Sequence, residues 1–250
     1  MKKTKQKVNA AILIIGNEIL SGRTQDLNVV TISKWLNDLG VKLEEVRVIP
    51  DIEKMIIKTV NNIRKNFNYV FTTGGIGPTH DDITAKSIAK AFNLKYGYHK
   101  EAYSILERYY GKAKFTSGRK KMSMMPIKAS LILNPSSGAP GFIVDNVFCL
   151  PGVPSILKSM LGGLNNKIKG GKKILNKTIS VQTVESEIAK SLEMIQQKFK
   201  RVEIGSYPFF RLGKIGVSIV IRSTDKKKID DCYKEIVSFL KKKKINMIEK

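Results

Sequence analysis

The chain has 250 residues, with 45 Lys and Arg against 21 Asp and Glu, and a formal net charge of +24. Hydrophobic residues make up 42% of the sequence, enough to bury the core of one large domain or of one medium domain plus a small one. Two histidines and two cysteines argue against a His/Cys zinc site, and no stretch is long enough to span a bilayer. Cys149 lies in the apolar run VFCL, which favours reduced thiols. We therefore expect a cytoplasmic protein without a membrane partner.

Strand and helix patterns alternate three times in the first part of the chain. Two apolar runs are too short for helices and are each followed by glycine, so they predict buried parallel strands at 10–15 and 69–73. A third strand is expected over 41–49, and apolar side chains at helical spacing predict helices over 29–39, 56–63 and 85–92. This alternation predicts an α/β protein with a doubly wound, mostly parallel sheet, whose ligands bind at the carboxyl ends of the strands.

The pattern changes after the middle of the chain. A helix over 101–110, strands at 131–133 and 142–150, and a helix that starts near Pro154 complete the first part. Residues 161–173, LGGLNNKIKGGKK, are typical of a loop or hinge. The order then becomes strand, helix, strand, strand, helix. We therefore expect two domains, residues 8–170 and residues 174–246, the second being a small α+β subdomain.

The stretch FTTGGIGPTHDD, residues 71–82, ends a predicted strand in a glycine-rich loop. Glycines let backbone amides approach a phosphate, and the amino end of the following helix adds a partial positive charge. The loop is neither a Walker loop nor a dinucleotide fingerprint, because no Gly-Lys-Ser/Thr and no G-x-G-x-x-G is present. The loop predicts a site for an oxyanion, but by itself it does not identify that oxyanion.

Four carboxylates follow predicted strands. Asp81 and Asp82 stand at a helix start, where either one could serve as N-cap, but capping needs only one of them. The second acid indicates a divalent cation that bridges carboxylate and phosphate and lowers the pKa of a bound water. Glu18 follows the first strand and Asp51 the next; capping or turn chemistry is the alternative for each. With Asn28 between them, all would converge at one edge of a parallel sheet.

Six segments carry a resemblance to a known family. GNEILSGRTQDLN, VRVIPD, FTTGGIGPTHDDIT, NPSSGAPGF, LPGVP and IGSYPFF, in this order and spacing, resemble the CinA-type branch of the MoaB/Mog (molybdopterin-binding-like) domain family over nearly the whole chain. The resemblance implies a three-layer α/β core. It also implies one of two activities: adenylylation of molybdopterin, as in the Mog and gephyrin type, or metal-dependent hydrolysis of ADP-ribose, FAD or similar dinucleotides, as in the CinA type.

The resemblance also assigns residues. It implies Asp51, Asp82 and Glu18 as catalytic groups. Together with the paired acids beside the glycine loop, this gives Asp51, Asp81 and Asp82 as expected ligands of a divalent metal, which would be Mg²⁺, Mn²⁺ or Co²⁺. The substrate-binding positions would be Asn28, Thr73, Gly74, Gly75, Gly77, Pro78, Thr79, Asn134, Gly138, Pro140, Gly141, Pro151 and Gly152. Two departures stand out: Ile156 replaces a usual Glu, and the sequence ends without the deamidase domain of full-length CinA proteins, so deamidase activity is not inferred.

Three functions remain open at this point. The leading hypothesis is a metal-dependent hydrolase of a nucleotide diphosphate such as ADP-ribose, and the second is a molybdopterin-binding or adenylyl-transfer protein. Either would bind a small nucleotide or pterin, and the family resemblance favours a homo-oligomer, a dimer or trimer. The third is a nucleic acid-binding protein that uses the net charge, but the lysines are scattered and form no helical stripe with aromatic residues, which argues against it.

Overall fold

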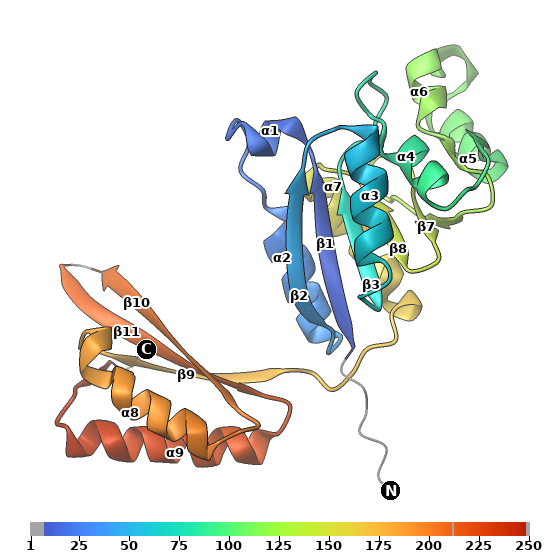
Figure 1. Cartoon of the computed structure of the whole chain (residues 1–250). Helices are drawn as coiled ribbons and strands as arrows, with labels where there is room; N and C mark the ends of the chain where they lie inside the picture. Colours follow the sequence, from blue (N-terminus) through green and yellow to red (C-terminus); the bar gives the residue numbers. More distant parts are fainter. Residues whose placement is uncertain (1–7, 212, 249–250) are drawn as a thin grey trace, which may run out of the picture. The chain divides into compact units, whose positions relative to one another are not determined.

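The computed structural model describes residues 8–211 and 213–248, and the chain divides into two compact units, residues 1–171 and 172–250 (Figure 1). Within the described ranges, none of the helices has the length and apolar composition needed to cross a membrane. Each unit is described by itself below.

The first unit is built on a six-stranded sheet in the order β2-β1-β3-β8-β7-β6. The strands β2, β1, β3 and β8 run parallel, whereas β7 and β6 are antiparallel additions. Their bounds are β1 Asn9–Ile15, β2 Lys42–Ile49, β3 Tyr69–Thr73, β6 Ser130–Ile132, β7 Gly141–Val144 and β8 Val147–Leu150. The prediction of a doubly wound, mostly parallel sheet is confirmed.

Helices cover both faces of this sheet, which gives three layers. Alternate side chains of β1 point to opposite faces: Leu13 and Ile15 pack with α3 and α4, whereas Ile12 and Ile14 pack with α2 and α7. The helices are α1 Asn17–Leu20, α2 Asn28–Asp38, α3 Glu53–Ile63, α4 Thr84–Ala91, α5 Lys100–Tyr110, α6 Ser117–Lys121 and α7 Pro154–Leu161. The remaining short elements of this unit are η1 Lys112–Lys114, η2 Gly162–Lys167 and the two-stranded sheet of β4 Tyr96–Tyr98 and β5 Met124–Pro126.

The apolar spacing of the sequence explains which helix faces are buried. Ile32 and Leu36 of α2 are fully buried, as are Ile56 and Val60 of α3. The helix α7 begins at Pro154, whose fixed φ and missing N–H suit the first helical position. The predicted core faces are therefore confirmed.

The second unit has a four-stranded antiparallel sheet in the order β10-β11-β9-β12, with two helices that share one buried cluster with it. Its elements are β9 Leu175–Val181, α8 Glu185–Lys198, β10 Glu203–Arg211, β11 Lys214–Ser223, α9 Lys226–Lys242 and β12 Met247–Ile248. Both α8 and α9 place an apolar face, including Ile188 and Ile236, in this cluster. A small α+β unit is thus present.

Candidate active site at the carboxyl edge of the sheet

The predicted acids follow three neighbouring strands. Glu18 lies in α1, directly after β1; Asp51 follows β2; Asp81 and Asp82 lie in the loop between β3 and α4. Because β2, β1 and β3 are adjacent and parallel, their carboxyl ends meet at one edge. The first βα connections therefore bring these side chains to the same edge of the sheet.

Asp51 is an acid of this edge whose pKa is raised. Its Oδ2 accepts a hydrogen bond of 2.9 Å from the backbone N–H of Asn17, at the start of α1. Partial burial raises the pKa of Asp51, and the negative charges of Glu18 and Asp81 raise it further, against the lowering effect of the Asn17 bond. Glu18 and Asp81 are therefore close enough to Asp51 for their negative charges to act on its carboxyl group.

The adjacent acids Asp81 and Asp82 have different surroundings. Asp82 Oδ2 accepts hydrogen bonds from the Thr79 N–H at 2.7 Å and from the Thr79 hydroxyl at 2.5 Å. Helix α4 begins at Thr84 and has no side-chain cap, so Asp82 closes the turn of the loop and does not cap the helix. Asp81 is exposed, and its pKa is lowered, first by the nearby Thr79 side chain, whose hydroxyl donates its one proton to Asp82 in this geometry, and more weakly by the charges of His80 and Lys121.

The glycine loop lies directly on the end of β1. Gly74 and Gly75 have φ angles of 96° and 68°, a region that favours glycine. A Cβ on Gly74 would collide with the carbonyl of Ile15, and one on Gly75 with the Thr84 side chain. Within the described ranges, the N–H groups of Ile76 and Gly77 have no protein acceptor. The loop therefore presents backbone donors suited to an oxyanion.

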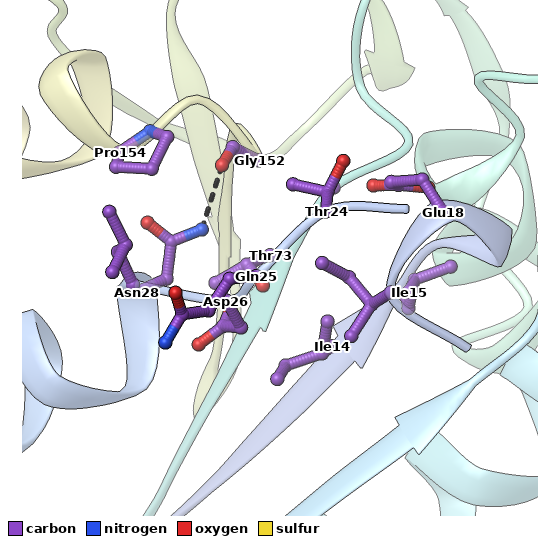
Figure 2. Close-up of a pocket in the computed structure, with 13 residues that line it drawn as sticks. Ile14, Ile15, Glu18, Thr24, Gln25, Asp26, Asn28, Thr73, Gly152 and Pro154 are labelled. Carbon is purple, nitrogen blue, oxygen red and sulfur yellow. Dashed lines mark hydrogen bonds between the residues drawn. The ribbon is translucent and has the colours of Figure 1, made fainter. Parts of the chain in front are cut away.

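A small cavity of about 50 Å³ opens beside this loop (Figure 2). Of the sequence-predicted residues, Glu18, Asn28, Thr73, Gly74 and Gly152 line it, together with Ile14, Ile15, Ile19, Thr24, Gln25, Asp26, Leu27 and Pro154. Since a cavity needs roughly 10–15 Å³ of such volume to hold one water, this one can take a few waters or the end of a ligand. Glu18 borders the cavity and also acts on Asp51, so it connects the cavity with the acids.

Asn28 joins two segments at this cavity. Its Nδ2 donates a 2.8 Å hydrogen bond to the carbonyl of Gly152, as Figure 2 shows. Because that carbonyl can only accept, the amide nitrogen must face it, which leaves Oδ1 as an acceptor. Oδ1 is buried and finds no partner among the described residues. The structure thus places one unsatisfied acceptor in the side chain of a residue that lines the cavity.

The segment Thr24–Leu27 also lines this cavity, although none of its residues is among those predicted from the sequence. Asp26 accepts a hydrogen bond from the N–H of Val29 and so stabilises the first turn of α2. An acid three residues before the start of the helix predicted at Val29 is a readable signal for a side chain that accepts from the first helical turn.

The remaining predicted binding residues do not line this cavity. Asn134 satisfies its own turn, since Oδ1 accepts from the N–H groups of Ser136 and Ser137 and Nδ2 donates to Ala139. Gly138 packs on the Tyr109 ring, and Gly141 lies in β7 against β8. Also outside the lining are Asp51, Gly75, Gly77, Pro78, Thr79, Asp81, Asp82, Pro140 and Pro151. Ile156 packs against the apolar cluster beneath α7.

The acids at this edge could bind a divalent cation only together with a substrate. Among the described residues, no three His, Cys, Asp or Glu side chains are close enough to hold an ion by themselves. Mg²⁺, however, is usually bound by one or two carboxylates together with waters and substrate phosphates. A cation would also relieve the repulsion that raises the pKa of Asp51. The donor set therefore suits a cation that is completed by the substrate.

Comparisons with known proteins agree with this fold. Residues 11–169 match the family described as the probable molybdopterin binding domain, and residues 173–249 match the FAD synthase middle domain. A crystal structure of the protein CinA from Thermoplasma acidophilum, described as having unknown function, has a TM-score of 0.60 and 30% identity, over 64% of this chain and 98% of that chain.

Relatives resemble the chain across both units. A protein of Archaeoglobus fulgidus is 33% identical over 93% of this chain and 98% of its own length. A CinA-like protein of Prochlorococcus marinus is 28% identical over 93% of this chain, and a probable FAD synthase of Caenorhabditis elegans is 31% identical over 81% of it. This chain spans 57% and 44% of the length of those two proteins. The chain therefore belongs to the probable molybdopterin binding domain family, as a CinA-like member that continues into an FAD synthase middle domain.

Proposed function

We propose that this chain is a divalent-metal-dependent hydrolase of a nucleotide diphosphate, with ADP-ribose as the first candidate substrate. The observation that carries the proposal is the convergence of Glu18, Asp51 and Asp81 from three adjacent strand ends, beside a loop with unpaired N–H groups. Such a site combines acceptors for a cation with donors for a phosphate. The likeness to CinA-like proteins and to a probable FAD synthase supports a nucleotide substrate.

In the proposed reaction each group has one task. The N–H groups of Ile76 and Gly77 bind a phosphate oxygen, and Asp51 and Asp81 would hold the cation. When bound, the cation supplies charge neutralisation and a lower pKa for water. Glu18 orients the attacking water and takes its proton. The water oxygen forms a bond to one phosphorus while the anhydride P–O bond breaks, and the bonding electrons leave with the other phosphate, which gives AMP and ribose 5-phosphate from ADP-ribose.

Asp82 has a positioning role in this proposal. Its carboxylate is already used by the two Thr79 donors and lies against Gly77. It thereby fixes the turn that presents Asp81 and the loop amides. Replacement of Asp82 by Ala is expected to abolish most of the turnover with the fold intact, because it removes the oxygen that accepts both bonds.

The second candidate is a molybdopterin-binding or adenylyl-transfer protein. The match of residues 11–169 to the probable molybdopterin binding domain favours it. A pterin would occupy the same edge of the sheet in place of the nucleoside. Copurification of a fluorescent pterin, or adenylyl transfer from ATP to molybdopterin, would support this second function over the first.

The test is a product assay on the purified chain with ADP-ribose, FAD and NAD, in Mg²⁺, Mn²⁺ or Co²⁺ and in chelator. Metal-dependent release of AMP is expected, and Asp51→Asn and Asp81→Asn should each reduce it at least 100-fold. Asp145→Asn is the matched control, because Asp145 is an exposed turn residue between β7 and β8 with φ 53°, which Asn also adopts. Turnover that survives both Asp51→Asn and Asp81→Asn would refute the assignment of the acids.

Two further expectations accompany the proposal. Cys149 and Cys232 are both free and buried, which supports a cytoplasmic setting. A dimer or trimer stays a prediction, and light scattering coupled to size exclusion tests it.

A further inference from the structure

A basic segment without acids adjoins the acidic edge. Between Glu107 and Asp145 the sequence has seven Lys and Arg and no Asp or Glu. Within it, α6 carries three consecutive basic residues, Arg119, Lys120 and Lys121. The fold places this helix against the glycine loop, since a Cβ on Gly118 would lie 3.7 Å from the side chain of Pro78, an ordinary packing distance.

The three basic side chains of α6 have different partners. Arg119 stacks over the Tyr110 ring at 4.1 Å and donates to the carbonyl of Lys114. Lys120 lies 5.7 Å from the Phe115 ring. Lys121 instead donates from Nζ to the carbonyl of Thr79, which lies 42 residues away in the glycine loop. One of the three is therefore directed at the loop.

Thr79 is the residue through which Lys121 can act on the acids. Its N–H and hydroxyl both donate to Asp82 Oδ2, and its carbonyl also accepts a 3.2 Å bond from the N–H of Asp82. The Thr79–Asp82 turn is thus bonded to Lys121 through the Thr79 carbonyl and to the Asp82 carboxylate through the Thr79 N–H and hydroxyl. The bond to Thr79 uses one of the three ammonium protons, which leaves donors for a phosphate oxygen.

We propose that Lys121 is a positioning residue of this site: it fixes the Thr79–Asp82 turn through the Thr79 carbonyl and supplies a positive charge to the substrate diphosphate. The inference rests on the proposed function for the diphosphate and on the hydrogen-bond geometry for the turn. Lys121 belongs to the basic segment, whose positive charge attracts a polyanion, and it is hydrogen-bonded to the loop that carries Asp81 and Asp82.

The test compares Lys121→Met, Lys121→Arg and the matched control Lys120→Met in the full chain. The first readout is amide hydrogen exchange of Thr79 and Asp82 by NMR, which needs no substrate. Lys121→Met should speed exchange of both amides at least 10-fold, Lys121→Arg should restore protection, and Lys120→Met should match the wild type. Equal exchange in Lys121→Met and Lys120→Met would overturn the inference.

The second readout is hydrolysis of ADP-ribose. Lys121→Met should raise KM about 10-fold or more and also lower kcat, whereas Lys121→Arg should recover kcat and most of KM, which a purely structural role in α6 would not produce. If the wild type cleaves no diphosphate but Lys121→Met still frees the turn, the hydrolase proposal fails and the positioning role stands. If the wild type cleaves ADP-ribose and Lys121→Met leaves KM and kcat unchanged, the hydrolase proposal stands and the inference fails.

Discussion

The negative charge of Asp51 is unfavourable in the folded state. Partial burial raises its pKa, and the neighbouring charges of Glu18 and Asp81 add to the effect. A carboxyl whose pKa is raised in the folded state contributes stability at low pH, and this contribution is lost as the pH rises through the folded pKa. At neutral pH, Asp51 therefore opposes folding, which is typical of a residue retained for function.

The first prediction concerns Asp51→Asn in chelator. The variant removes the partly buried charge and keeps an oxygen for the Asn17 N–H, so its Tm at pH 7 should equal or exceed that of the wild type, by roughly 1–3 °C. The difference should shrink as the pH falls toward about 4, where the unfolded carboxyl also binds its proton. Thermal melts from pH 4 to pH 8 check this. A wild type more stable than the variant at pH 7 would contradict the assigned direction.

The second prediction concerns Gly77→Ala. Gly77 has no positive φ, so alanine is tolerated by the backbone, but its Cβ would lie 2.7 Å from Asp82 Oδ2. The carboxylate must move and release Thr79. Since a displacement of about 1 Å can cost on the order of 100-fold in rate, we expect a loss of that size in turnover with little change in Tm.

The control for Gly77→Ala is Gly118→Ala. This change adds the same methyl group next to the same loop, but at an ordinary contact distance of 3.7 Å from Pro78 and inside helix α6. Turnover should stay at the wild-type level. If both alanine variants lose activity equally, crowding of Asp82 is not the cause.

At the scale of elements, the cavity depends on a contact between the start of α2 and the loop before α7. Asn28 makes this contact through Gly152, and its Oδ1 remains buried without a partner among the described residues. A buried acceptor without a donor is unfavourable. A ligand N–H or O–H, such as that of a base or ribose, would satisfy it, whereas a phosphate oxygen would not.

The third prediction follows for Asn28→Ala. It should weaken ligand affinity, by about 10-fold for one lost hydrogen bond, and destabilise the fold by about 1 kcal/mol. Asn146→Ala is matched to it: Asn146 also donates through Nδ2, to the carbonyls of Arg64 and Phe67, and also has an unpartnered Oδ1, but it precedes β8, at the opposite edge. Calorimetric titration of both variants checks this. Equal affinities would remove Asn28 from recognition.

The elements also show what the sequence could predict. Apolar runs and helical spacing predicted β1, β3 and the core faces of α2 and α3, because the spacing of apolar residues within a short segment shows which of its side chains are buried. The convergence of Glu18 and Asp51 followed from strand direction. The different surroundings of Asp81 and Asp82 could not be predicted, because they depend on the hydrogen bonds that Thr79 donates to Asp82. The same holds for Lys121, whose partner lies 42 residues away.

At the scale of the whole molecule, the two units have separate cores. The buried residues of the sheet and helices in residues 1–171 form two clusters, and the cluster around Ile188 and Ile236 is made of residues beyond 171. The segment up to Gly171 belongs to the first unit, because the Gly171 N–H donates to the carbonyl of Gly40 and Gly170 packs on Leu39. A cut after Gly171 therefore keeps the first core complete.

The fourth prediction is that residues 1–171 fold alone and keep the proposed activity. Glu18, Asp51, Asp81 and Lys121 all belong to this unit, and so does every residue that lines the cavity. The fragment should cleave ADP-ribose within about 3-fold of the full chain, and residues 172–250 should fold without activity. Near-ultraviolet circular dichroism establishes folding first, and the product assay follows. A folded but inactive fragment would mean that the second unit, from the same chain or from another copy, completes the site; activity retained by the fragment would confine the chemistry to the sheet edge.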